Sequence, residues 1–128
     1  MNAPKWLNAV IQEFGAGLDL HDFGLNDQNA ASLRFETGVS LRFEYAFESL
    51  VIAVMIPAAQ EPKLMRRLLS YTQPELRPSF KLRVGYLAKS SCVLMAARLS
   101  EREVTLPALN AVFTELWRLA EDYRRRIV

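Results

Sequence analysis

The feature that most constrains this chain is a pair of short segments in which apolar and polar residues alternate strictly. In Leu33-Arg34-Phe35-Glu36 and in Val39-Ser40-Leu41-Arg42-Phe43-Glu44-Tyr45, every apolar residue has an odd number. Period two puts the apolar side chains on one face of an extended strand. Thr37-Gly38 between the segments is typical of a tight turn. The pattern predicts a hairpin with one buried face, whose exposed charges pair across the strands, Arg34 and Arg42 with Glu36 and Glu44.

Three further segments read as strands. Leu50 to Ile56 is apolar without alternation, which predicts a strand covered on both faces or forming a contact surface, and Pro57 ends it. Phe80 to Leu87 is apolar at even positions, and Cys92 to Leu99 follows after turn residues. Most of these connections are too short for a crossover, so the sheet is expected to be antiparallel.

Helical periodicity appears in three other segments. Trp6 to Phe14 is apolar at one-four spacing, and the shorter Leu64 to Leu69 repeats this pattern. A long helix is predicted from Leu106 to Arg126, with Thr105 as its N-cap. The second helix could cross over between the third and fourth strands.

Residues 18–31, rich in Asp and Asn, are expected to be a linker or an irregular strand. Pro74 to Pro78 should be a non-helical connector.

The expected order is therefore helix, three strands, helix, two strands, helix. This is an α+β fold in which helices pack on an antiparallel sheet, and residues 1–128 suit a single domain with 51% hydrophobic residues. No apolar run of about 20 residues predicts a membrane helix. Residues 1–14 lack the continuous apolar stretch of a signal peptide. The single cysteine excludes an internal disulfide and fits the reducing cytoplasm.

Candidate residues for chemistry are few. Cys92 and His21 are the only cysteine and histidine, which is too few for an ordinary metal site, and no local motif supports a catalytic dyad. Gly15 and Gly17 follow a predicted helix and suit its C-terminal end better than a dinucleotide loop. The net charge of the chain is only +2, and the basic residues Arg124 to Arg126 complement the dipole of the predicted C-terminal helix. The sequence indicates no cofactor, no metal and no nucleic-acid partner.

Several local patterns point to one family. They are the amphipathic helix Trp6 to Phe14 with Gly15-Ala16-Gly17-Leu18, the segments Leu33 to Phe35 and Val39 to Phe43, the apolar strand Leu50 to Pro57, the helix Leu64 to Leu69, the strand Val93 to Leu99, and Leu109 to Phe113 with Trp117. In these patterns and their order, the chain resembles the class I type III secretion chaperones, small bacterial proteins that bind secreted effectors before export. It departs from these usually acidic proteins in its pI of about 8.9.

The resemblance implies an α-β-β-β-α-β-β-α homodimer without enzymatic activity. An extended N-terminal effector segment would wrap around it and be kept competent for export, which fits strand addition to a sheet edge. Effector contact is expected at Trp6, Val10, Leu33, Phe35, Leu41, Phe43 and Val54. The dimer interface is expected at Leu68, Leu69, Tyr71, Val84 and Tyr86. Each of these residues also suits a place in the hydrophobic core.

Two other readings stay open. The chain could be a structural or regulatory subunit of the secretion apparatus that shares the chaperone fold, possibly in a heterodimer. It could also be a small enzyme that uses Cys92 or His21.

Overall fold

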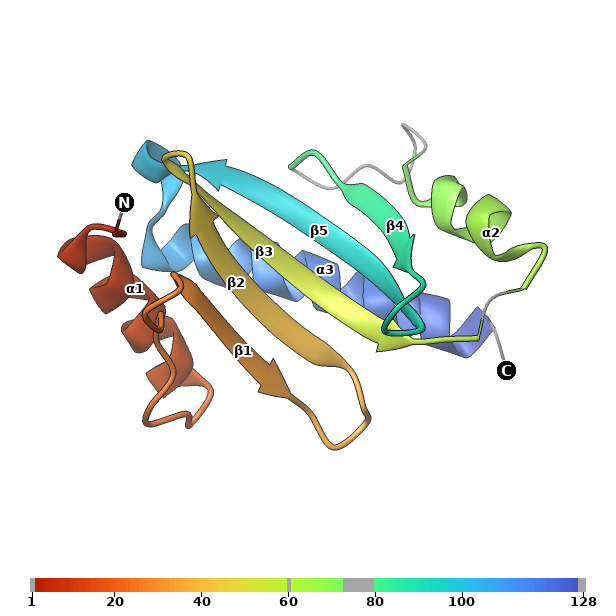
Figure 1. Ribbon diagram of the computed structural model, residues 1–128, viewed down its shortest axis with the longest axis horizontal. Helices are drawn as coiled ribbons and strands as arrows, with labels where there is room; N and C mark the ends of the chain where they lie inside the picture. Colours follow the sequence, from red (N-terminus) through yellow and green to blue (C-terminus); the bar gives the residue numbers. More distant parts are fainter. Residues whose placement is uncertain (1, 60, 73–79, 127–128) are drawn as a thin grey trace.

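A computed structural model describes residues 2–59, 61–72 and 80–126, and it confirms the predicted α+β fold and element order (Figure 1). The elements are α1 (Lys5–Gly17), β1 (Ala30–Arg34), β2 (Ser40–Ala46), β3 (Ser49–Pro57), α2 (Leu64–Ser70), β4 (Arg83–Leu87), β5 (Cys92–Ser100), the short 3-10 helix η2 (Glu101–Glu103) and α3 (Leu106–Arg126).

The five strands form one sheet in the order β1-β2-β3-β5-β4, and all neighbours are antiparallel. Because β5 lies between β3 and β4, these two strands run parallel to one another. The connection that contains α2 is therefore a crossover, as the sequence predicts. β1 and β4 are the two edge strands.

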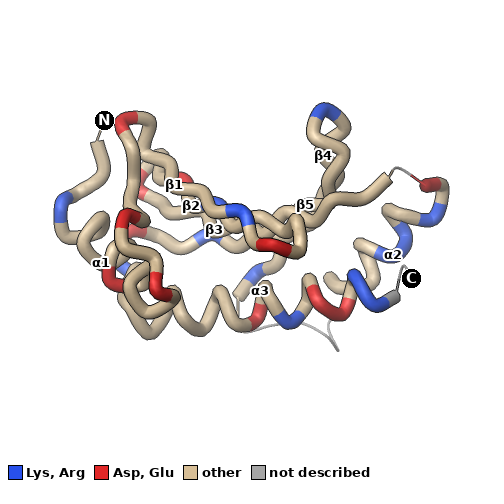
Figure 2. Tube along the Cα trace, turned by 90° about the horizontal axis from the view of Figure 1, so that it is seen from below, with Lys and Arg blue, Asp and Glu red and all other residues tan. Residues whose placement is uncertain are grey.

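The helices cover one face of the sheet. In Figure 2, α3 runs along this face, with α1 and α2 near its two ends. The alternation in the first hairpin positions its side chains as predicted: Leu41 and Phe43 are fully buried, whereas Glu44 is exposed.

The predicted pairing of charges across this hairpin is wrong. The backbone N–H of Phe35 donates to the carbonyl of Val39, so the turn is centred on Thr37. The resulting register places Arg34 opposite Ser40 and Arg42 opposite Ser32. The guanidinium of Arg42 instead contacts Glu44 of the same strand, at 3.4 Å.

Aromatic contacts join α1 to the rest of the core. The ring of Phe14 lies 5.3 Å from that of Phe43 in β2 and 5.5 Å from that of Phe113 in α3. Phe23, in the loop after α1, meets Phe43 edge-on at 5.5 Å. A helix end, a loop and the sheet therefore share one aromatic cluster.

The long C-terminal helix begins where the sequence predicts. The hydroxyl oxygen of Thr105 accepts a 3.1 Å hydrogen bond from the backbone N–H of Ala108, which is the geometry of an N-cap. Its buried face comprises Leu109, Val112, Leu116, Leu119, Ala120 and Tyr123.

Two strand boundaries differ from the prediction. β1 begins at Ala30 and ends at Arg34, whereas the alternation pointed to Leu33 to Glu36. β4 begins at Arg83, so Phe80 to Leu82 lie outside the strand. Both are edge strands whose extent depends on partner residues in the next strand, which local alternation does not report. The predicted connector Pro74 to Pro78 lies outside the described residues.

Candidate functional site

The first candidate surface lies where α3 reaches from α1 to the end of β1. The ring of Phe113 contacts Phe14 of α1 at 5.5 Å, and Trp117, one turn further along α3, lies 4.8 Å from Phe35. Leu33 precedes Phe35 by two residues and therefore lies on the same face of the chain. We call Val10, Leu33, Phe35, Phe113 and Trp117 the α1–β1 face; all five side chains are half-buried.

Trp6 adds exposed aromatic surface to this side of the molecule. Its side chain is 48% exposed, and it precedes Val10 by four residues on α1, so the two are neighbours on the helix surface. The sequence predicted Trp6, Val10, Leu33 and Phe35 as contact residues. It did not predict Phe113 and Trp117 as contact residues, because their spacing is that of a buried helical stripe.

A strand edge lies next to the α1–β1 face. Among the described residues, β1 pairs with β2 alone, so its outer backbone groups face away from the sheet. Such an edge can accept another extended chain through backbone hydrogen bonds.

Three predicted contact residues lie in the interior instead. Leu41, Phe43 and Val54 are each 0% exposed, in the central strands under the helices. Their side chains cannot touch a partner in this conformation. They belong to the core that supports the surface residues.

The second candidate surface is formed by α2 and β4, which pack against each other. Met65, Leu69 and Leu87 are exposed there by 45%, 54% and 38%. We call Met65 and Leu69, together with the half-buried Val84 and Tyr86, the α2–β4 face; Leu87 follows Tyr86 directly and therefore points to the opposite side of β4.

Of the residues predicted for the dimer interface, Leu69, Val84 and Tyr86 thus reach a surface, whereas Leu68 and Tyr71 are buried in the single chain. The Tyr86 hydroxyl donates to the carbonyl of Ala58 at 3.1 Å, which fixes its ring. Met65 and Leu87 were missed, because a short amphipathic helix and an edge strand do not show from sequence alone which apolar side chains remain uncovered.

The charges around the α2–β4 face are mainly basic. Lys63, Arg66, Lys81 and Arg83 are exposed there, while Arg67 is paired with Glu61 at 3.3 Å. Figure 2 shows basic residues along α2 and at the neighbouring end of α3.

The two residues considered for catalysis do not form a reactive site. Cys92 is 6% exposed, and burial raises the pKa of its thiol above the ordinary value, which disfavours the reactive thiolate. His21 lies in an exposed turn before β1. Within the described residues, no group of three or more His, Cys, Asp or Glu side chains could hold a metal ion. None of the described helices is long and apolar enough to cross a membrane.

Comparison with solved structures shows the same fold in secretion chaperones. The ExsC–ExsE complex matches with a TM-score of 0.82 and 22% identity, over 98% of this chain and 96% of that one. The HopA1–SchA chaperone–effector complex matches at 0.74 and 14%, over 97% and 99%. SycH of Yersinia pestis matches at 0.68 and 14%, over 91% and 98%.

Among curated protein sequences, the comparison found no match. The family assignment therefore comes from a sequence model of the type III secretory system chaperone SycN, which matches residues 6–123. It confirms the resemblance seen in the sequence, and it assigns the chain to chaperones, not to enzymes. With nearly its whole length matched and the fold in agreement, the chain belongs to the SycN family of type III secretion chaperones.

Proposed function

We propose that this chaperone binds an extended N-terminal segment of a secreted effector protein and keeps it competent for export in the cytoplasm. The observation that carries the proposal is the α1–β1 face, where half-buried apolar side chains lie beside the edge of β1. Among the described residues no strand pairs with this edge, and only its first residue, Ala30, has its backbone N–H and C=O bonded to Asn26. Two similar structures are the HopA1–SchA chaperone–effector complex and the heterodimeric ExoU–SpcU complex from the type III secretion system of Pseudomonas aeruginosa.

Binding of the effector segment would combine two kinds of contact. The edge of β1 supplies backbone hydrogen bonds that tolerate many sequences, and the apolar side chains select residues at alternate positions of the bound strand. Each apolar side chain removed from water adds roughly 25 cal/mol per Å² of buried surface. Since the cargo becomes ordered on binding, part of this gain offsets its lost conformational entropy.

Within this surface, Trp6, Val10, Leu33 and Phe35 make the contacts. Leu41, Phe43 and Val54 lie in the core beneath the surface and support it; the ring of Phe43, for example, packs against that of Phe14 in α1. A defect in these three residues should reduce stability first and binding only as a consequence.

The experiment is a titration of the purified chain with the N-terminal segment of its co-purifying effector. Trp6→Ser and Phe35→Ser should each raise Kd by about tenfold or more, as loss of an aromatic anchor does. Lys89→Ser, in the exposed turn between β4 and β5, is the control and should leave Kd unchanged. Unchanged Kd in both aromatic variants, with the fold intact by circular dichroism, would overturn this assignment of the surface.

We further propose a homodimer joined through the α2–β4 face. Its exposed Met65 and Leu69 would be buried against a second copy, with β4 at the seam. Sedimentation should give about twice the chain mass of 14.6 kDa. Leu69→Glu should then yield monomers, and a wild-type monomer at every concentration would exclude the homodimer.

The basic rim of this face supports a second candidate, a heterodimer with an acidic chain of the same fold. A symmetric pair would bring Lys63, Arg66 and Arg83 close to their own copies, and such like charges repel. Salt screens this repulsion, so a homodimer should tighten as ionic strength rises. A heterodimer with an acidic partner should weaken under the same conditions.

A further inference from the structure

The tip of the β2–β3 hairpin presents an unusually exposed aromatic side chain. Phe47 is 92% exposed, compared with 48% for Trp6. It lies in the two-residue turn between Ala46 and Ser49, and neither it nor its neighbours belong to the two faces described above. A large apolar ring left in water at a turn contributes nothing to the core.

The conformation of this turn is also unfavourable for its residues. Phe47 and Glu48 have φ angles of 52° and 58°, in the left-handed region that two-residue hairpin turns of type I′ require. Asn-Gly is the preferred pair at such positions, because a bulky side chain there meets the backbone. Folding alone therefore does not account for phenylalanine at this position.

Neighbouring elements hold the turn firmly. The Tyr45 hydroxyl donates to Oε1 of Glu101 at 3.0 Å, and the backbone N–H of Glu101 donates to the carbonyl of Glu48 at 2.9 Å. The backbone N–H of Tyr45 donates to the carbonyl of Asn29, also at 2.9 Å. A partner that binds Phe47 would thus meet a preorganised surface and would spend little free energy on ordering it.

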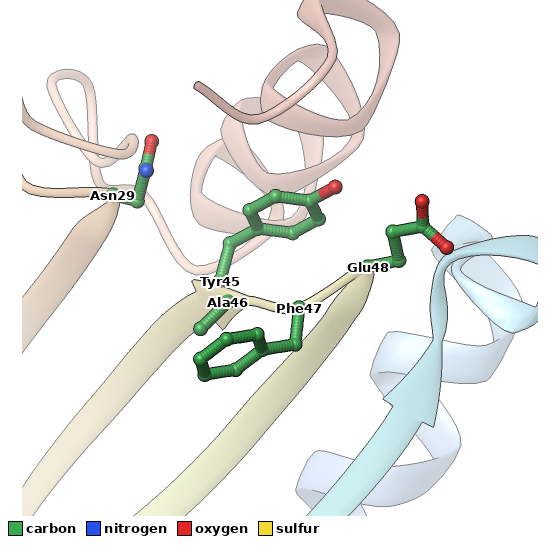
Figure 3. A pocket seen from close by; sticks show the side chains of 5 residues that line it. All are labelled: Asn29, Tyr45, Ala46, Phe47 and Glu48. Atoms are coloured by element: carbon green, nitrogen blue, oxygen red, sulfur yellow. The ribbon is translucent and has the colours of Figure 1, made fainter. Parts of the chain in front are cut away.

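A hollow of about 600 Å³ adjoins the ring, lined by Asn29, Tyr45, Ala46, Phe47 and Glu48 (Figure 3). The local charge is negative. Glu48 is exposed and takes part in none of the ion pairs found among the described residues. Burial raises the pKa of Tyr45, and the carboxylates of Glu101 and Glu48 raise it further. The Phe47 ring and the Glu48 carboxylate project to different sides of the turn (Figure 3), which suits an extended segment that carries an apolar side chain next to a cationic one.

We propose that the hairpin tip is a second docking point, for a protein segment that carries Arg or Lys next to an apolar residue. The cationic side chain pairs with Glu48. The adjacent apolar residue packs on the Phe47 ring in the hollow. This contact goes beyond effector binding at the α1–β1 face, since it lies at the opposite end of β1 from Phe35 and selects for positive charge.

The test uses the full chain, labelled with ¹⁵N, and two synthetic peptides of equal length as probes, one alternating Leu and Arg, the other Leu and Glu. The basic peptide should produce saturable shifts of the amide signals of Asn29, Phe47 and Glu48, and the acidic peptide should not. Phe47→Ser and Glu48→Lys should each weaken binding of the basic peptide by about tenfold. Lys89→Ser, in the exposed turn between β4 and β5, is the control, and its affinity should match that of the wild type.

Both substituted side chains are exposed, so the variants should fold, and a circular dichroism spectrum checks this. The proposal is overturned if the basic peptide shifts signals elsewhere but not at the hairpin. It is also overturned if both peptides bind equally, or if the two hairpin variants retain wild-type affinity. Each of these outcomes is independent of the effector titration, which reports on Trp6 and Phe35.

Discussion

The hydroxyl of Tyr71 donates a 2.8 Å hydrogen bond to Oδ2 of Asp122, and this contact fastens the end of α2 to the last turns of α3. The Tyr71 ring is 1% exposed and lies 6.3 Å from that of Tyr123. The position of α2, and with it the α2–β4 face, therefore depends on the C-terminal helix. Tyr71 acts on any dimer indirectly, by holding α2 in place.

Tyr71→Phe is expected to lower the free energy of unfolding by about 1.5–3 kcal/mol, because it removes a hydrogen bond to a charged acceptor and leaves the carboxylate short of a donor. Urea denaturation measures the change. Tyr86→Phe is the matched control: its hydroxyl donates to a neutral carbonyl, that of Ala58, so the loss should be only about 0.5–1.5 kcal/mol. An equal or larger effect at Tyr86 would contradict this account of the α2 anchor.

Gly15 is required by the close approach of the loop that follows α1. A Cβ atom at this position would lie 2.6 Å from Cβ of Phe23, whose ring is part of the aromatic cluster around Phe43. Gly15→Ala must displace Phe23 and should destabilise the chain by roughly 1–3 kcal/mol, the usual cost of overpacking.

Gly17→Ala is the control for this substitution, since nothing lies within 4 Å of its added Cβ. It should be neutral or stabilising by up to about 1 kcal/mol, because alanine favours a helix more than glycine does. Thermal unfolding compares the two variants directly. Equal melting temperatures would show that Phe23 moves aside freely.

Sequence periodicity predicted the elements whose pattern is set by their own burial. The alternation from Val39 to Tyr45 and the N-cap Thr105 are local signals, and the structure confirms both. The register of the first hairpin, in contrast, is not set by the burial of its own residues. It depends on which residue centres the turn, and a shift of the pairing moved the charges of Arg34 and Arg42 away from the glutamates expected to face them.

The candidate surfaces were harder to predict for a related reason. An apolar residue in a strand pattern is equally suited to the core and to a contact surface. Leu33 and Leu41 read alike in the sequence, yet Leu41 is covered by helices and Leu33, on the edge strand, is only half-buried. Phe47 shows the opposite case: no sequence pattern singled it out, and only its φ angle and exposure distinguish it.

Phe47→Gly is expected to stabilise the chain. Glycine adopts the left-handed conformation at no steric cost, which relieves about 1–2 kcal/mol, while its greater freedom in the unfolded chain takes back about 0.5–1 kcal/mol. The net gain of roughly 0.5–1 kcal/mol should appear as a higher midpoint in urea denaturation. Gly38→Ala is the converse control, because Gly38 has a φ of 91° and should lose stability on substitution. A Phe47→Gly variant less stable than the wild type would mean that the ring supports the hairpin.

Tyr45 is expected to make the stability of the chain depend on alkaline pH. Burial raises the pKa of its phenol, and the hydrogen bond to Glu101 raises this pKa further. In the unfolded chain the group titrates near pH 10. The folded chain therefore holds the phenol proton more tightly than the unfolded chain does. The contribution of Tyr45 to stability is fully present below about pH 10 and is lost as pH rises through the folded pKa.

Tyr45→Phe has no such proton, and its melting temperature should fall less steeply between about pH 9 and 11 than that of the wild type. Glu101→Gln, which removes the carboxylate but keeps an acceptor, should show an intermediate slope. Identical slopes in all three proteins would refute the link between Tyr45 and the alkaline transition, whatever the cause of the remaining decline.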